Sequence, residues 1–273
     1  DPITDTWSHY TRYGSSSNSL SHTSILSLHK DMQGNIWVGT YYGGVNVFNP
    51  DKNNHSFYCA EPLREDCLSF PVVGKMTEDS AGNVWICTEG GGLNCYHGDT
   101  GVFSRYMYQK GDQSTLGSNN VKSVFYRKEN NRLYAGTHLG GLFVLDLKSN
   151  KGHTLHHVTG DPASLPHEIV NDIQEYKDGI AMLTQGGPVF FDPVTEKFSP
   201  LTDDPSVQKL ISREYAFETF LIDSRQRMWL AVGGGGIVCV NLSSSKVTQY
   251  LADSEKDTLT VGRYKTVHIF EDN

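Results

Sequence analysis

The chain has 273 residues, a formal net charge of −8, 37% hydrophobic residues and 20% charged residues. It is too apolar for a disordered protein, and its Lys and Arg residues form no run of the kind that a general nucleic-acid-binding surface needs. No apolar stretch reaches the roughly 20 residues of a membrane helix, so we expect a globular segment without a membrane span, a signal segment or direct nucleic-acid binding.

The first expected element is a strand at residues 7–12, which follows an Asp-Pro turn signal at residues 1–2. Because a complete four-strand unit begins only at residue 24, we assign residues 1–14 to the end of a preceding unit.

The first complete unit spans residues 24–70 and is predicted to form four short strands. Alternating apolar residues mark the first strand, a tight Asp-x-x-Gly turn follows, and a Trp-centred strand leads into a Gly-Gly turn. A third strand and an Asn-Pro turn then precede the fourth strand. The predicted elements are Ile25–His29, Asp31–Gly34, Asn35–Thr40, Gly43–Gly44, Val45–Phe48 and Asn49–Pro50.

Four further units follow, at about 71–120, 121–168, 169–213 and 214–262. The second glycines of the five Gly-Gly pairs are Gly44, Gly92, Gly141, Gly187 and Gly236, which gives spacings of 48, 49, 46 and 49 residues. The fourth unit lacks the aromatic residue, and the fifth has Ala231-Val232 in place of Gly-Thr. Four antiparallel strands in such a repeat are typical of a β-propeller blade, and no segment shows a helical pattern of helix length.

The last expected element is the inner strand of a following blade at 266–273. The chain is therefore predicted to be all-β: one β-propeller segment, residues 1–273, with five full blades and a partial blade at each end. Six or seven blades are consistent with this arithmetic, the missing strands coming from flanking sequence, because an open propeller would expose two sheet edges.

The five cysteines match no zinc-binding spacing. Cys95 and Cys239 fall at equivalent places in two repeats and are interpreted as buried apolar side chains. Cys59 and Cys67 flank a loop, so they either form a disulfide in an oxidising compartment or remain free thiols.

The repeat resembles a known family. Residues 31–44 read Asp-x-x-Gly-Asn-x-Trp-x-Gly-Thr-x-x-Gly-Gly, and inter-blade stretches such as Asp161-Pro-Ala-Ser-Leu-Pro166 recur in phase with that pattern. Both motifs are similar to two-component regulator propeller repeats. The resemblance implies part of a seven-bladed propeller in the periplasmic sensor region of a Bacteroides-type hybrid two-component system (hybrid histidine kinase/response regulator).

The same resemblance implies a biological setting. The parent chain would be an inner-membrane protein, attached through a helix outside this segment, and would form a homodimer. It would sense carbohydrate and control polysaccharide-utilisation genes through its histidine kinase, so the segment itself would not be an enzyme and would carry no cofactor or metal.

The Trp residues of the repeat are interpreted as blade-packing residues, which leaves function to positions that vary between blades. We expect the second-to-third strand turns and the blade-to-blade loops to meet around the mouth of the channel, where aromatic, amide, acidic and Arg side chains would suit an oligosaccharide, neutral or acidic. The candidate ligand-binding residues are Tyr41, Tyr42, Arg64, Glu89, His138, His167, Gln185, Arg213, Tyr215, Arg263 and Tyr264.

Two alternatives stay open. His138 and Glu89, on neighbouring turns, are the one pair that could serve a propeller lyase or another glycan-active enzyme, although no nucleophile or metal motif accompanies them. A structural propeller used only for dimerisation is the other alternative.

Overall fold

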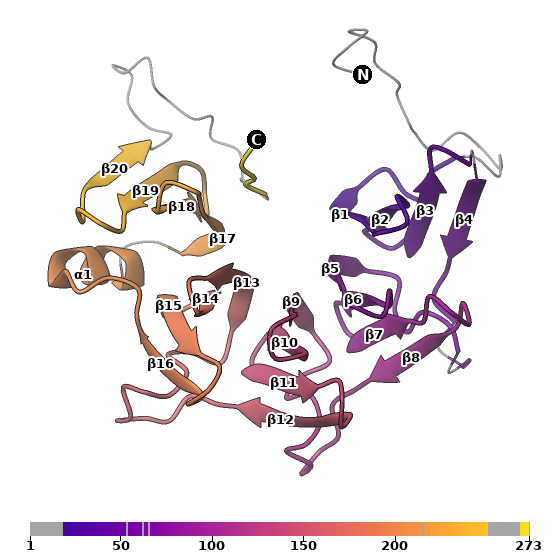
Figure 1. The fold of residues 1–273 in the computed structure, drawn as a ribbon, viewed down its shortest axis with the longest axis horizontal. Coiled ribbons are helices and arrows are strands. Elements are labelled where there is room, and N and C mark those ends of the chain that lie inside the picture. Colours follow the sequence, from indigo (N-terminus) through magenta and orange to yellow (C-terminus); the bar gives the residue numbers. More distant parts are fainter. Residues whose placement is uncertain are drawn as a thin grey trace, which may run out of the picture. The chain divides into compact units, whose positions relative to one another are not determined.

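The computed structural model describes residues 19–52, 54–61, 63–64, 66–213, 216–250 and 268–272. The predicted strand at residues 7–12 lies outside these ranges. The described part contains five sheets of four antiparallel strands, and in every sheet the strands are neighbours in sequence order (Figure 1). This meander is the topology predicted for a propeller blade.

The chain divides into two compact units, one of residues 1–107 and 119–121 and one of residues 108–118 and 122–273. The first unit holds the first two sheets, whose strands are β1 (Ile25–Lys30), β2 (Ile36–Thr40), β3 (Val45–Asn49), β4 (Asn54–Tyr58), β5 (Val73–Glu78), β6 (Val84–Thr88), β7 (Leu93–Tyr96) and β8 (Phe103–Tyr106).

The second unit holds the other three sheets and one helix. Its elements are β9 (Val121–Arg127), β10 (Arg132–Thr137), β11 (Leu142–Asp146), β12 (Lys151–Leu155), β13 (Val170–Tyr176), β14 (Gly179–Thr184), β15 (Gly187–Asp192), β16 (Lys197–Pro200), α1 (Pro205–Arg213), β17 (Phe217–Ile222), β18 (Arg227–Val232), β19 (Ile237–Asn241) and β20 (Val247–Tyr250).

The Asp of each Asp-x-x-Gly turn holds the Trp of the next strand. In the first sheet, the indole Nε1 of Trp37 donates to Asp31 at 2.7 Å, and the backbone N of Asn35 donates to the other carboxylate oxygen at 2.7 Å. The same indole-to-carboxylate bond recurs at 2.9 Å in the second and fifth sheets, between Trp85 and Asp79 and between Trp229 and Asp223. The turn therefore fixes the orientation of the Trp ring as well as its own backbone.

The predicted packing role of Trp37 is confirmed in the first unit. Its side chain is only 2% exposed and belongs to an apolar cluster with Val84, Ile86 and Phe103 of the second sheet. Burial of this kind between two sheets is what a stack of blades requires.

The second glycine of the Gly-Gly pair is required by the backbone. Gly44, Gly92 and Gly141 have φ values of 68°, 74° and 72°. A Cβ added to Gly44 would also lie 2.3 Å from the carbonyl oxygen of Tyr58 in the fourth strand. The left-handed conformation and the close backbone both exclude a side chain.

The connections between sheets run along the fourth strand of the next sheet before they reach its first strand. The backbone N of Phe103 in β8 donates to the carbonyl of Asp66, and that of Phe198 in β16 donates to the carbonyl of Ala163. The leucines of the recurring inter-blade motif point into the core: Leu68 and Leu165 are fully buried. The motif is thus a docking segment for the outer strand.

The helix α1 contradicts the prediction that no segment has a helical pattern. It occupies the connection between β16 and β17, and its residues Val207 and Ile211 are 3% exposed on one face. Asp204 caps it by accepting from the backbone N of Ser206 at 2.9 Å, and Pro205 stands at its first position. The nine-residue length is short, but an Asp-Pro start followed by apolar residues four apart is a helix signal that the repeat pattern obscured.

Residues 268–272 have no regular secondary structure, although a strand was predicted there. Glu271 nevertheless accepts hydrogen bonds from the backbone N of Ser224 at 2.8 Å and from its hydroxyl at 2.6 Å. Glu78 of β5 holds the turn of the first sheet in a comparable way, by accepting from the backbone N of Met32 at 2.7 Å. Each glutamate lies about one repeat after the turn that it holds, so Glu271 is the counterpart of Glu78.

Candidate functional site

The Gly-Gly turns lie against the ends of the connections. The backbone N of Gly44 donates to the carbonyl of Pro71 at 2.9 Å, that of Gly92 to Asn119 at 2.8 Å, and that of Gly141 to Glu168 at 2.9 Å. Each of these bonds joins a turn to the segment that enters the next first strand. In these three sheets the turn and the end of the connection therefore lie at the same edge, whereas their meeting around a channel mouth stays a prediction.

Tyr41 and Tyr42 form an exposed aromatic pair on the turn between β2 and β3. Their rings are 4.6 Å apart at an angle of 80°, and the residues are 43% and 60% exposed. His22, in the connection that enters β1, has its ring 6.4 Å from that of Tyr41. A sugar ring can stack on such exposed aromatic faces while the phenol and imidazole groups hydrogen-bond to its hydroxyls.

The backbone of Tyr42 is left-handed, with φ of 66°. Two of the corresponding turn positions are glycines, Gly90 with φ of 127° and Gly234 with φ of 104°, and a third is Leu139 with φ of 60°. A bulky side chain in this region is strained, and such strain tends to persist where function maintains it. The position is thus occupied by an aromatic residue although glycine would suit its backbone better.

Glu89 and His138 stand on the corresponding turns of the second and third sheets, and both are half-buried. Glu89 pairs through its backbone with Val72 and forms a β-bridge with Asn120. It belongs to the first compact unit and His138 to the second. Their pairing across a channel therefore stays a prediction.

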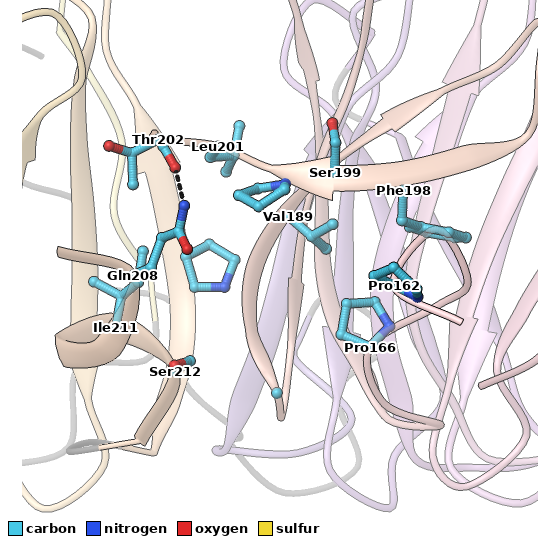
Figure 2. A pocket seen from close by; sticks show the side chains of 13 residues that line it. Pro162, Pro166, Val189, Phe198, Ser199, Leu201, Thr202, Gln208, Ile211 and Ser212 are labelled. Atoms are coloured by element: carbon cyan, nitrogen blue, oxygen red, sulfur yellow. Dashed lines mark hydrogen bonds between the residues drawn. The ribbon is translucent and has the colours of Figure 1, made fainter. Parts of the chain in front are cut away.

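His167, Gln185 and Arg213 each adjoin a residue that lines one cavity of the second unit. Figure 2 shows this cavity of about 190 Å³ between the strand pair β15–β16 and α1. Its lining residues are mostly apolar and include four prolines; they are Pro162, Pro166, Gly186, Pro188, Val189, Phe198, Ser199, Pro200, Leu201, Thr202, Gln208, Ile211 and Ser212. His167 follows Pro166, Gln185 precedes Gly186, and Arg213 follows Ser212 in the chain.

This cavity exists because the fourth unit departs from the repeat. The helix α1 supplies Gln208, whose amide donates to the carbonyl of Thr202 at 2.6 Å, and Ile211 beneath it. Proline rings supply rigid C–H surface on the opposite wall. The site can accept a small, mainly apolar group, and sequence reasoning missed it because it missed the helix.

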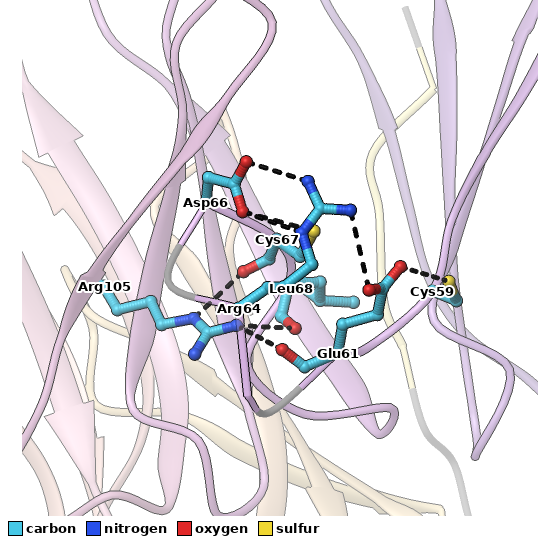
Figure 3. Close-up of polar contacts among 7 residues, drawn as sticks. All are labelled: Cys59, Glu61, Arg64, Asp66, Cys67, Leu68 and Arg105. Carbon is cyan, nitrogen blue, oxygen red and sulfur yellow. Dashed lines mark hydrogen bonds and ion pairs between the residues drawn. The ribbon is translucent and has the colours of Figure 1, made fainter.

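Arg64 is the candidate that the structure places differently from the expectation. It lies in the first half of its connection, in a cavity that it shares with Gly101–Phe103 beside the fourth strand of the next sheet. Its guanidinium pairs with Asp66 at 2.9 Å and with Glu61 at 3.6 Å (Figure 3). The connection follows the outer strand before it reaches the Gly-Gly turn, so Arg64 lies beside β8 and is engaged by carboxylates.

Tyr215, Arg263 and Tyr264 lie outside the described residues, as does the side chain of Arg213. These four stay predictions.

A third cavity, of about 440 Å³, opens between the first two sheets beside the Asp-x-x-Gly turns. Trp37, Tyr58 and Tyr96 line it together with Asp31 and Asp99. The hydroxyl of Tyr58 donates to that of Tyr96 at 3.0 Å, and burial together with this bond raises the Tyr58 pKa well above its ordinary value. The Tyr58 phenol therefore remains neutral over the physiological pH range.

Within the described ranges, no group of three or more His, Cys, Asp and Glu side chains is arranged to hold a metal ion. No helix of that part of the chain is long and apolar enough to cross a membrane.

Comparison with known proteins adds a sequence match and a fold match. The family model described as "Two component regulator propeller" matches residues 19–42. This part of the chain is similar to a two-component regulator propeller repeat. It comprises β1, the Asp-x-x-Gly turn, β2 and the exposed tyrosines, so the aromatic pair lies at the end of the matched repeat.

Solved structures share the fold over most of the chain. The extracellular domain of the hybrid two-component system BT3049 from B. thetaiotaomicron matches with a TM-score of 0.73 and 22% identity, over 97% of this chain and 33% of that one. The corresponding domain of BT4673 from the same organism matches with a TM-score of 0.63 and 21% identity, over 83% and 30%. The WD40 repeats of RRP9 match with a TM-score of 0.60 and 11% identity, over 89% and 68%.

The shared fold is a β-propeller assembled from four-stranded blades, and the predicted fold class is confirmed. The chain spans about a third of the length of the two extracellular domains. No curated protein sequence matches it.

Proposed function

We propose that this chain is part of an extracytoplasmic sensor propeller that binds an oligosaccharide and transmits its occupancy to a histidine kinase. The fold is that of two extracellular domains of hybrid two-component systems, and the chain contains a repeat named for such regulators. The kinase, the membrane helix and control of polysaccharide-utilisation genes belong to the parent protein and are part of the proposal.

The observation that carries the ligand assignment is the Tyr41–Tyr42 pair. The two rings are exposed, meet at 80°, and are held on a turn whose backbone would be less strained with glycine. Loops on a rigid scaffold carry binding more often than the scaffold itself does. A stacked pyranose ring is the ligand that best fits paired phenols next to an imidazole.

A neutral oligosaccharide is favoured over an acidic one. Arg64, one of the candidate ligand-binding residues, already pairs with Asp66 and Glu61, and the sequence carries a net charge of −8. Because long-range attraction of an anion would be screened by salt, the two ligand classes predict different salt dependence.

Titration calorimetry of the complete extracytoplasmic region with a panel of neutral and acidic oligosaccharides tests the proposal. We expect saturable binding of one neutral ligand, little change in affinity between about 0.05 and 0.15 M salt, and no change in the ligand after prolonged incubation. Turnover of the ligand would favour the enzyme with His138 and Glu89. Absence of heat with every oligosaccharide would leave a propeller that serves in dimerisation.

A further inference from the structure

The backbone brings the segments that contain Cys59 and Cys67 together. Ala60 and Leu68 form an isolated parallel β-bridge, and the backbone N of Glu61 donates to the carbonyl of Leu68 at 3.1 Å. Cys59 and Cys67 each directly precede a residue of that bridge. Paired strands lie about 4.7–4.9 Å apart, which falls within the roughly 4.4–6.8 Å between the Cα atoms of a disulfide.

Both cysteines are more accessible than the leucine of the bridge. Leu68 is fully buried in the apolar cluster of the first unit, so the bridged pair faces the core. Side chains alternate along extended chain, and accordingly Cys59 is exposed and Cys67 half-buried.

Arg105 of β8 holds both segments in place. Its guanidinium donates to the carbonyls of Glu61 at 2.9 Å and Cys67 at 3.0 Å, and thus ties the two ends of the loop together (Figure 3). The thiols are free in the structure, with Cys59 Sγ 3.8 Å from a carboxylate oxygen of Glu61. Closure therefore requires both thiols to leave these contacts, while the bridge and Arg105 hold the two segments together.

We propose that Cys59 and Cys67 are a disulfide site that cross-links the two ends of the connection between the first two sheets. The Cys59 thiolate attacks a sulfur of a disulfide oxidant and expels one thiol. The Cys67 thiolate then attacks the Cys59 sulfur of the mixed disulfide and expels the second thiol. Two electrons and two protons pass from the cysteines to the oxidant, which ends as two thiols.

The other three cysteines differ from this pair. Cys87, Cys95 and Cys239 are buried, and burial raises the pKa of the Cys95 thiol to about 12. Thiols of this kind are inert because the thiolate is the reactive form. Cys59 is the more exposed of the two remaining thiols, which makes it the first nucleophile.

Peptide mapping of the full-length protein tests the site. Trypsin cuts after Lys52, Arg64 and Lys75, so the peptides 53–64 and 65–75 separate unless a disulfide joins them. The reduced protein is equilibrated with a glutathione redox buffer, in native buffer and in guanidinium chloride, and then alkylated and digested. We expect a joined peptide two hydrogens lighter than the sum of its parts, absent from both C59S and C67S.

The comparison of native and unfolded protein decides whether the fold directs the pairing. The equilibrium constant for closure should be about tenfold or more higher in native buffer, because the bridge and Arg105 position the two residues. Separate alkylated peptides in native buffer, or equal constants in the two solvents, would overturn the proposal.

Formation in the cell rests on the extracytoplasmic location proposed above, whereas closure in the redox buffer does not. Protein alkylated directly in cells should show the joined peptide. If closure occurs in the redox buffer but the cellular protein is fully reduced, the location fails and the disulfide site stands.

Discussion

Replacement of Tyr42 by either Gly or Ala separates the stability cost of its left-handed backbone from the contribution of its ring to ligand binding. Both changes remove the same aromatic contact with Tyr41, so the difference between them reports the conformation at φ of 66°. A left-handed residue other than glycine costs about 1–2 kcal/mol. Glycine loses about 0.5–1 kcal/mol more chain entropy than alanine on folding. Tyr42→Gly should therefore be about 0.5–1 kcal/mol more stable than Tyr42→Ala, the reverse of the usual order.

The assay is chemical denaturation combined with titration calorimetry on the complete extracytoplasmic region. Both variants should bind the oligosaccharide about 5- to 150-fold more weakly, which corresponds to roughly 1–3 kcal/mol for a binding anchor. Gln226 is the matched control, because it has φ of 58° in an Asp-x-x-Gly-type turn where the first sheet has Gly34. Gln226→Gly should likewise exceed Gln226→Ala in stability, with affinity unchanged.

Two results would refute this reasoning. Tyr42→Ala more stable than Tyr42→Gly by the full chain-entropy difference of about 0.5–1 kcal/mol would show that the turn is not strained. Undiminished affinity in both would show that the ring contributes nothing to the site, whatever its conformation.

Three further predictions concern the Asp–Trp pairs. Asp79→Asn replaces a carboxylate oxygen, which only accepts hydrogen bonds, by an amide group that donates. That group would face other donors, including the Trp85 indole at 2.9 Å, so the free energy of unfolding in urea should fall by about 2–4 kcal/mol. Trp85→Ala should cost about 3–5 kcal/mol, with ligand selectivity unchanged, because the ring is 3% exposed. Burial alone would raise the pKa of Asp223, but hydrogen bonds from Trp229 and the neighbouring turn lower it below the ordinary value. The stabilising contribution of ionised Asp223 is therefore fully present above the pKa of this residue in the unfolded chain, and it is lost as the pH falls through the pKa in the folded protein. Asp223→Asn should remove this loss of stability at acid pH in a series of unfolding experiments at different pH values.

The repeat made the sheets predictable, because each strand carries a local signal and the signals recur in phase. The turn glycine and the buried Trp follow from backbone and packing demands that every blade shares. The helix α1 was missed because its signal, Asp204-Pro205 followed by Val207 and Ile211, occurs once and interrupts the repeat.

The site residues were less predictable, because a loop position does not reveal which half of the connection it occupies. Tyr42 stands within the repeat, and its position on the turn follows from the pattern. Arg64 stands in a connection, and only the bond between Phe103 and Asp66 shows that this part of the chain follows the outer strand. The proline-lined cavity depends on α1 and could not be anticipated without it.

The hydrogen bonds between successive sheets have a consequence for folding. Ser27 donates to the carbonyl of Gly74, and Thr219 to the carboxylate of Asp172, each across 47 residues. Closing a loop of one repeat is thus enough to pack each of these sheets against its neighbour. The chain entropy lost on closure grows only slowly with loop length. Assembly can begin at either of these sheet pairs and extend one repeat at a time, as in other repeat proteins. Duplication or loss of a whole repeat would leave the length of each remaining closure unchanged, whereas an insertion of half a repeat would break the register of every later contact.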